Sequence, residues 1–183
     1  MQHYHSLPDV SIQNAWLTIG VFDGVHRGHQ AILRQLAAGA HQNGAPAVLL
    51  TFDPHPANVL AGRDIKLLTT PDERAELLAS LGLDAVITEP FDRSLAETSA
   101  RDFMAQLKEH IDLSHLLIGY DFALGKNREG NARRLTELGL EMGYTAEVAP
   151  ALSAESGVIS STEIRKLISV GNVTEAAKLL GRN

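Results

Sequence analysis

Short apolar runs alternate with stretches of helical periodicity along the chain, and this alternation limits the possible fold more than any other feature of the sequence. The runs that we predict to be strands span residues 17–22, 47–52, 85–88, 116–118 and 146–149. Strands that alternate with helices are typical of βαβ units, in which neighbouring strands are parallel. We therefore predict an α/β protein with a mostly parallel sheet of about five or six strands and helices on both faces.

Apolar residues three and four positions apart predict the helices between these strands. The first helix follows the first strand and has one apolar face, formed by Ile32, Leu33, Leu36, Ala37 and Ala40. The second begins with a capping box and a proline, in the run Thr70-Pro71-Asp72-Glu73, and Gly82 is expected to stop it. Two further helices are predicted around 103–111 and 135–142, and two short terminal helices have the caps Ser160 with Glu163 and Asn172 with Glu175. We expect long irregular loops over 53–64 and 121–130.

Composition sets broad limits on the class of protein. The chain has 183 residues, of which 44% are hydrophobic, enough for one domain with a sizeable core. Because it contains no cysteine, disulfides, thiolate catalysis and cysteine-bound metals are excluded. The sequence has no signal segment and no apolar run of membrane-spanning length, so we expect a cytoplasmic protein without a membrane partner. The formal charge of −6 argues against a nucleic-acid partner; the sequence predicts no oligomeric state.

Residues 20–30 read Gly-Val-Phe-Asp-Gly-Val-His-Arg-Gly-His-Gln and lie between the first predicted strand and the first predicted helix. His26 and His29 would share one face of the first helical turn. The run also contains three glycines, which allow tight turns and close approach to a ligand, at Gly20, Gly24 and Gly28. Because a helix N-terminus attracts anions, this segment predicts a phosphate site, suited to a nucleoside triphosphate attacked at its α-phosphorus. Two alternatives are a histidine pair used in capping or packing, and a metal site that lacks an evident third ligand.

Three more segments follow predicted strands or begin a helix. In Thr-Phe-Asp-Pro-His-Pro, two prolines stiffen the loop that presents Asp53 and His55, either at the rim of an acceptor pocket or as a rigid surface turn. In residues 119–130, Asp121 could accept a hydrogen bond from a nucleotide, Phe122 could stack on a ring, and a cation could reach phosphate, namely Lys126 or Arg128. The alternative for that segment is an exposed glycine-rich loop. Ligands of parallel α/β sheets bind at the carboxyl ends of strands, which favours the functional interpretation.

The third segment is Ile-Ser-Ser-Thr-Glu-Ile-Arg, residues 159–165. Ser160 and Glu163 could form an ordinary capping box. Capping does not require the hydroxyls of Ser161 and Thr162 or the guanidinium of Arg165, and these groups at a helix start are suited to gripping phosphate.

The His-Arg-Gly-His run resembles the His-x-Gly-His signature of the nucleotidyltransferase superfamily. Together with Thr-Phe-Asp-Pro-His-Pro, Gly-Tyr-Asp-Phe-x-x-Gly and Ile-Ser-Ser-Thr-x-Ile-Arg, it occurs in the order and spacing of the bacterial FAD synthetase family. There these segments belong to the FMN adenylyltransferase module of bifunctional riboflavin kinase/FAD synthetases. The resemblance extends from about Trp16 to Arg182 and implies a Rossmann-like nucleotidyltransferase fold.

The resemblance implies that AMP is transferred from ATP to FMN, giving FAD and pyrophosphate, with Mg²⁺ and without a covalent enzyme intermediate. It implies catalytic roles for His26, His29 and Arg165. It implies ATP-binding roles for Gly20, Phe22, Gly28, His29, Asp121, Ser161, Thr162 and Arg165. The FMN-binding roles that it implies fall on Asp23, Asp53, His55, Pro56, Asn58 and Arg128. It assigns no metal ligands.

The chain departs from the family pattern in two places. Leu124 stands where the family usually has an aromatic residue, and the chain stops at Asn183, where bifunctional members continue into a riboflavin kinase domain. We therefore expect one FMN adenylyltransferase domain over 1–183 and no riboflavin kinase domain. Two other functions stay open: a nucleotidyltransferase that uses another phosphate acceptor, and a nucleotide- or flavin-binding protein without turnover.

Overall fold

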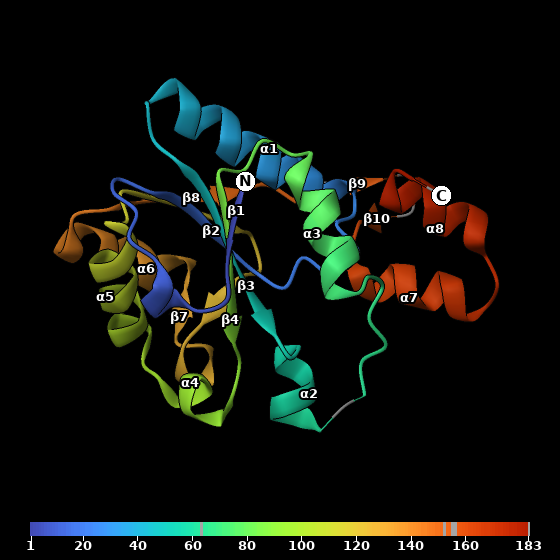
Figure 1. The fold of residues 1–183 in the computed structure, drawn as a ribbon. Coiled ribbons are helices and arrows are strands. Elements are labelled where there is room, and N and C mark those ends of the chain that lie inside the picture. The colour runs from blue at the N-terminus through green and yellow to red at the C-terminus, as the bar shows by residue number, and fades with distance from the viewer. Residues whose placement is uncertain (63, 152, 155–156, 183) are drawn as a thin grey trace.

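The computed structural model describes residues 1–62, 64–151, 153–154 and 157–182. Its centre is a six-stranded sheet, shown in Figure 1, with the order β1-β4-β3-β2-β5-β8 and parallel pairing throughout. The strands are β1 (Gln2–Tyr4), β2 (Trp16–Ile19), β3 (Ala47–Asp53), β4 (Ala85–Pro90), β5 (His115–Gly119) and β8 (Thr145–Ala149). The prediction of an α/β fold with a parallel sheet is confirmed.

Helices connect the strands and extend the chain beyond the sheet. They are α1 (Arg27–Gln42), α2 (Pro56–Ala61), α3 (Pro71–Ala79), α4 (Arg93–Glu97), α5 (Ala100–Ile111), α6 (Ala132–Met142), α7 (Ser161–Ser169) and α8 (Val173–Leu180). Two 3₁₀ turns are η1 (Leu7–Asp9) and η2 (Lys126–Arg128). Two small antiparallel ribbons pair β6 (Ala123–Leu124) with β7 (Gly130–Asn131), and β9 (Ser153–Ala154) with β10 (Gly157–Val158).

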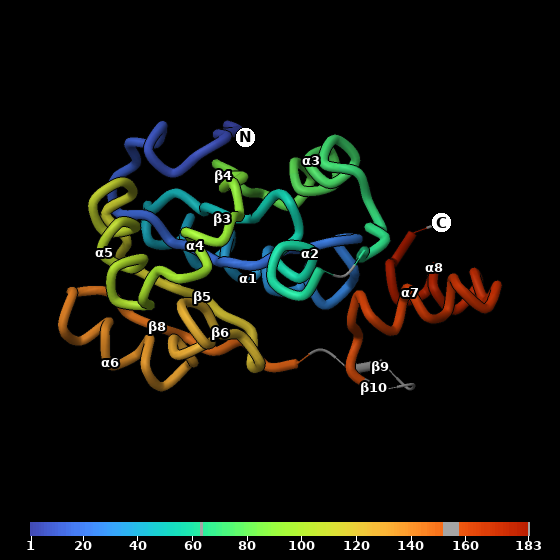
Figure 2. The backbone as a smooth tube through the Cα atoms, turned by 90° about the horizontal axis from the view of Figure 1, so that it is seen from below, coloured from blue at the N-terminus to red at the C-terminus, as the bar shows by residue number. Residues whose placement is uncertain are grey.

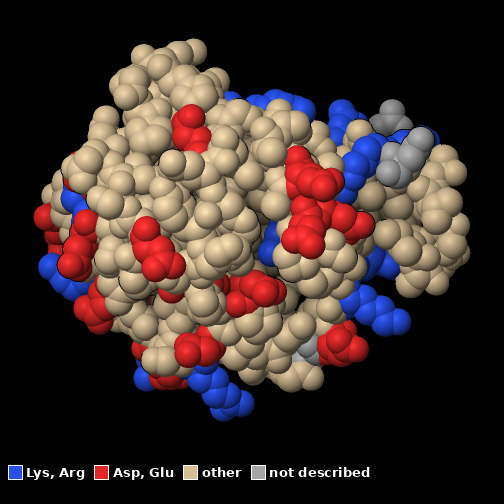
Figure 3. All heavy atoms as spheres, viewed as in Figure 1, with Lys and Arg blue, Asp and Glu red and all other residues tan. Residues whose placement is uncertain are grey.

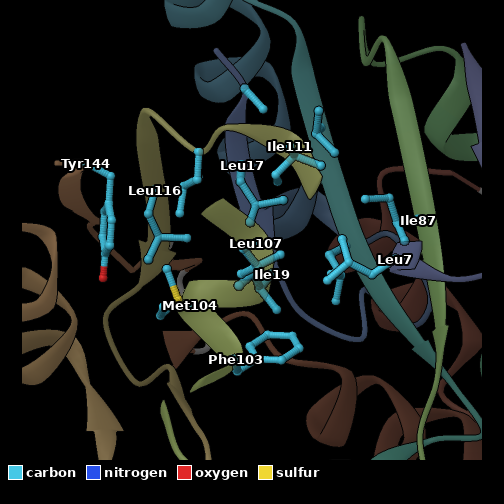
Figure 4. Packing of buried hydrophobic residues seen from close by; sticks show 14 of the residues in the cluster. Leu7, Leu17, Ile19, Ile87, Phe103, Met104, Leu107, Ile111, Leu116 and Tyr144 are labelled. Carbon is cyan, nitrogen blue, oxygen red and sulfur yellow. The ribbon is translucent and has the colours of Figure 1, made fainter. Parts of the chain in front are cut away.

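Side chains alternate between two cores, one on each face of the sheet. Along β3, Val48 and Leu50 point into one core, whereas Leu49 points into the other, as the period of two in a strand requires. The first core packs β-strand residues against α5, with Met104, Leu107 and others drawn in Figure 4. The second packs the sheet against α1 and α3. Helices therefore cover both faces, as predicted.

The two C-terminal helices form a separate layer at one end of the molecule, as Figures 1 and 2 both show. Ile164 of α7 packs with Ala176 and Leu179 of α8, and Leu68 lies against this small cluster. The caps predicted for these helices are present: Ser160 accepts a hydrogen bond from the backbone N–H of Glu163, and Asn172 from that of Glu175. This packing brings the start of α7 toward the carboxyl edge of the sheet.

Several sequence-based boundaries need correction. The first strand ends at Ile19 rather than residue 22, because the chain turns at Gly20. The Thr70 capping box is present, but α3 ends at Ala79 with Ser80 as its C-cap, so Gly82 does not stop it. The stretch 53–64 contains α2, and 121–130 contains β6, η2 and the first residue of β7, so neither is wholly irregular. β1 was not predicted, since its short polar sequence carries no apolar run.

Candidate active site

The strand order places one edge of the sheet where a ligand is expected. The connections from β2 to β3 and from β5 to β8 diverge on opposite sides of the neighbouring strands β2 and β5. In doubly wound sheets, such a switch point opens a crevice at the carboxyl ends of the strands. Residues 20–29, which we call the histidine turn, leave β2 at this position.

The histidine turn is packed so tightly that its glycines have little room for side chains. A Cβ at Gly20 would lie 2.8 Å from the ring of Phe22, and one at Gly28 would lie 3.1 Å from the ring of His26. Phe22 is buried, adopts a positive φ of 52°, and places its ring 4.8 Å from that of His29. Gly20, Phe22 and Gly28, which are predicted to bind ATP, therefore allow the close packing that holds the two histidine rings in place.

His26 and His29 stack with 3.5 Å between ring centroids and 18° between ring planes. His26 is the N-cap of α1, and its Nδ1 accepts a hydrogen bond of 3.3 Å from the backbone N–H of His29. Because an acceptor nitrogen carries no proton, neutral His26 has its hydrogen on Nε2. The capping alternative is therefore confirmed for His26, and its ring also lies against that of His29, whereas the phosphate-binding role of the pair stays a prediction.

Burial keeps both histidines neutral. It lowers the pKa of His26 to about 4, against the opposing effect of the Asp23 charge. It also holds the pKa of His29 well below the ordinary value of 6.5, and proximity to His26 acts in the same direction. Among the residues that the structure describes, the Nδ1 of His29 is the one buried side-chain nitrogen or oxygen without a hydrogen-bond partner. Neutral imidazoles with Nε2–H groups are hydrogen-bond donors rather than fixed cations.

The start of α7 faces the histidine turn. The hydroxyl of Ser161 donates to the backbone oxygen of Asp23 at 2.9 Å, and a Cβ at Gly28 would lie 3.7 Å from the carbonyl oxygen of Ile159. Thr162 is exposed in the first turn of α7. Two helix N-termini thus converge, each with unpaired N–H groups and a positive dipole end.

The end of α8 holds the backbone of the histidine turn. The guanidinium of Arg182 donates to the carbonyl oxygens of Gly24 at 2.8 Å and Val25 at 3.5 Å. Gln30 donates to Val25 and to Leu180, each at 2.9 Å. Val25 has a φ of 39°, which is strained for a β-branched residue. These contacts therefore stabilise a conformation that the local sequence disfavours.

A cavity of about 540 Å³ opens beside the histidine turn. The carboxyl ends of β2, β3, β4 and β5 all contribute to it, together with α2 and α4, which lie below these strands in Figure 1. Its lining is largely apolar and includes four aromatic residues: Phe52, Phe91, Phe103 and Phe122. Of the predicted site residues, four line it: Gly20, Pro56, Asp121 and Arg128.

Arg128 donates to the backbone oxygen of Asp121 at 3.0 Å, which fixes the loop that closes the cavity. Leu124, the departure from the family pattern, is also a lining residue.

The other residues predicted to bind FMN lie at the end of β3, around α2 or, for Asp23, inside the histidine turn. Asp53 is exposed at the end of β3, and His55 caps α2 by accepting from the backbone N–H of Ala57. Asn58 accepts a hydrogen bond from the backbone N–H of Ile65, which holds the following loop. Asp23 is only 2% exposed, and its carboxylate is occupied by protein donors. The structure therefore does not bring these four into the cavity lining.

Arg74 is a buried cation that sequence reasoning missed. It is only 4% exposed on α3, and its Nη1 donates to the backbone oxygen of Val21 at 3.3 Å. Among described residues it has no ion pair; burial lowers the pKa of Arg74, while the charges of Asp23 and Asp53 raise it. Position 74 lies three residues before Leu77 and four before Leu78, so the helical period indicates a core-facing position. Phe91 and the residues of α4 that line the cavity were also missed, although their place after a strand is a usable signal.

Comparison with known proteins decides the family. The family model described as FAD synthetase matches residues 9–163. The chain belongs to the FAD synthetase family. A FAD synthetase from Listeria monocytogenes is 33% identical over 183 residues, which cover 99% of this chain and 74% of the relative. A bifunctional riboflavin kinase/FMN adenylyltransferase from the same organism is 35% identical over 92% of this chain and 54% of its own length. This FAD synthetase family member thus spans about half the length of the first curated relatives that it matches.

A solved structure described as a macrolide-efflux protein from Streptococcus pneumoniae has a TM-score of 0.87 and 27% identity to this member of the FAD synthetase family. The match covers 99% of this chain and 61% of that one. The efflux activity in that description belongs to the other protein; here the likeness supports the fold. In the part of the chain that the structure describes, no helix is both long and apolar enough to cross a membrane.

Proposed function

We propose that this chain is an FMN adenylyltransferase, which transfers AMP from ATP to FMN and releases pyrophosphate. The observation that carries the proposal is the meeting of two helix N-termini at a stacked histidine pair, directly beside an aromatic-lined cavity. The first arrangement suits a triphosphate, and the second suits a planar ring system. Membership of the FAD synthetase family supports both assignments.

In the proposed reaction, an oxygen of the FMN phosphate forms a bond to the α-phosphorus of ATP. The bond from that phosphorus to the bridging oxygen breaks, and pyrophosphate leaves with the electron pair. The Nε2–H group of His26 and the ring N–H group of His29 donate hydrogen bonds to phosphate oxygens as negative charge shifts toward the leaving group. Arg165 and the N-terminus of α7, with the backbone N–H of Ser161 and the hydroxyl of Thr162, hold the triphosphate from the other side. Catalysis then depends on positioning and charge stabilisation.

The flavin ring is proposed to occupy the cavity, where Phe52, Phe91 and Phe122 offer aromatic contacts. Asp121 and Arg128 are the polar groups that could orient it. Gly20 lines the cavity and begins the histidine turn, so a ligand in the cavity would lie next to the proposed triphosphate site.

The residues at this edge of the sheet fit a Mg²⁺ ion that is bound mainly by the substrate phosphates. Among described residues, no group of three His, Asp or Glu could hold a metal ion. Mg²⁺ is usually bound by one or two carboxylates together with substrate phosphates and water. We propose Asp53, an exposed carboxylate at the carboxyl edge of the sheet, as its protein ligand. The ion would neutralise phosphate charge during transfer. A cytoplasmic location and the absence of nucleic-acid and membrane partners stay predictions.

The direct test is incubation of the purified chain with ATP, Mg²⁺ and FMN, with chromatography of the flavin products. FAD formed from FMN, with pyrophosphate released, would support the proposal. A parallel reaction with riboflavin tests the expectation that these 183 residues hold no riboflavin kinase domain. If FMN fails, a panel of other phosphate acceptors identifies a different nucleotidyltransferase, whereas ATP binding without turnover on any acceptor indicates a binding protein.

Filling the cavity should impair flavin use selectively. Ala96 lines the cavity from α4, so Ala96→Trp places a large ring where the flavin is proposed to bind. We expect the KM for FMN to rise by about tenfold or more, and the KM for ATP to change little, because the steric clash affects one substrate only. Steady-state kinetics measure both constants. Ala105→Trp, at an exposed position of α5, is the matched control. An equal rise in both KM values would contradict the assignment of the cavity.

A further inference from the structure

Asp23 was predicted to bind FMN, but its carboxylate has no free oxygen for a substrate. Oδ1 accepts from the backbone N–H groups of Leu68 at 2.9 Å and Thr69 at 3.1 Å, and from the Thr69 hydroxyl at 3.2 Å. Oδ2 accepts from Arg165 at 2.5 Å. With a residue exposure of only 2%, Asp23 is held in place from both sides.

Arg165 is only partly used by these contacts. Its Nε donates to the backbone oxygen of Lys66 at 2.9 Å, and its Nη2 donates to Asp23. A guanidinium has five N–H donors, so three remain available. The Arg165 side chain is 22% exposed, whereas that of Asp23 is 2% exposed. The ion pair therefore fixes the plane of the guanidinium and leaves donors that can face a ligand.

The support behind Asp23 is itself rigid. The hydroxyl of Thr69 donates to Asp23 and accepts from the backbone N–H of Gly24 at 3.1 Å, which ties the support to the histidine turn. The next residue, Thr70, begins α3 with a complete capping box. On the other side, the backbone oxygen of Asp23 accepts from Ser161 of α7. Asp23 thus joins the histidine turn, residues 66–69 and α7 in one hydrogen-bonded unit.

We propose that Asp23 is a positioning residue, which orients Arg165 toward the triphosphate of ATP and does not contact flavin. The proposal rests on the proposed function to the extent that the anion is ATP. Preorganisation is the physical reason: a long arginine side chain that is already fixed loses less conformational freedom when it binds phosphate. Because the carboxylate is anchored by three donors from residues 68–69, it can hold Arg165 without moving itself.

The sharpest variant is Asp23→Asn, because the two side chains have nearly the same shape. The amide oxygen can still accept from Leu68 and Thr69, which leaves the NH₂ group facing Arg165, donor against donor. The anchor is retained and the link to Arg165 is lost. Asp112→Asn is the matched control, since it removes an exposed aspartate–lysine pair on α5, at a C-cap where asparagine is tolerated.

We expect Asp23→Asn to weaken Mg·ATP binding by about tenfold or more, as measured by calorimetry without FMN, and to raise the KM for ATP similarly. The KM for FMN should change little. In an Arg165→Met background, Asp23→Asn should have no further effect on ATP binding, because both changes act through the same guanidinium. Chemical denaturation checks that each variant is folded.

Three results would overturn the proposal. Tighter ATP binding by Asp23→Asn would mean that Asp23 competes with the triphosphate for Arg165. A selective rise in the KM for FMN would restore the flavin-binding role. Additive losses in the double variant would indicate a general structural effect. Calorimetry with wild-type protein separates these from failure of the proposed function, since ATP binding is measurable when no FAD is formed.

Discussion

Replacing His29 with alanine should reduce turnover of FMN to FAD by roughly 10²–10³-fold, the loss typical of removing one donor that stabilises a developing negative charge. The expected change in FMN affinity is far smaller, because His29 stacks on His26 and packs at a tilt against Phe22 in the histidine turn, and none of these three lines the cavity. An interaction made mainly in the transition state lowers kcat rather than ground-state binding. Steady-state kinetics with FMN and ATP varied separately measure both effects.

Two further variants make this prediction specific. His29→Asn keeps a side-chain N–H donor and should recover part of the lost turnover. His41→Ala, at the exposed opposite end of α1, should retain full activity, because it removes a surface imidazole from the same helix. Equal losses of kcat and FMN affinity in His29→Ala would contradict the transition-state role.

Acid should destabilise the protein through the buried histidines. The pKa of His26 is about 4 in the folded protein against 6.5 ordinarily, so the unfolded chain binds a proton first as pH falls. The contribution of His26 to the free energy of unfolding is therefore fully present above pH 6.5 and declines from there toward pH 4. For His26 alone, the loss between pH 8 and pH 5 is about 2 kcal/mol, and burial of His29 adds a loss of the same sign. Denaturant titrations at several pH values measure it.

His26→Asn separates titration from capping. Asparagine is a good N-cap and can accept the hydrogen bond from the backbone N–H of His29, but it does not titrate. We expect the variant to lose about 2 kcal/mol less than the wild type over the same pH interval. His41→Asn serves as the control with an exposed histidine. An unchanged pH dependence in His26→Asn would show that His26 is not the group responsible.

Local signals in the sequence were sufficient for the main elements of the fold. Val48, Leu49 and Leu50 read as an uninterrupted apolar run because β3 is covered on both faces, and such a run identifies an inner parallel strand. The Thr70 capping box fixed the start of α3. β1 could not be predicted in this way, since Gln2–Tyr4 pair at the sheet edge and need no apolar sequence.

The residue types of the candidate site could be predicted from the sequence, but the contacts between them could not. The spacing of His26 and His29 placed both rings on one helical turn, yet no pattern reports that their rings stack or that His26 also caps α1. Asp23 and Arg165 are far apart in the sequence, and only the docking of α7 creates their ion pair. Net charge was similarly uninformative about local charge: on the face drawn in Figure 3, an acidic group covers α3 while basic atoms border the region of α7 and α8.

The hydrogen bonds from Arg182 to the carbonyl groups of Gly24 and Val25 determine where a tag can be attached to this protein. An affinity tag or fluorescent fusion attached after residue 183 would begin one residue beyond Arg182. We therefore expect it to disturb the two hydrogen bonds by which Arg182 stabilises the histidine turn. The same tag before Met1 would extend from the outer strand β1, whose neighbour in the sheet is β4. Purification handles and reporters therefore belong at the amino end, and activities measured with carboxyl-terminal fusions should be compared with those of the tag-free chain.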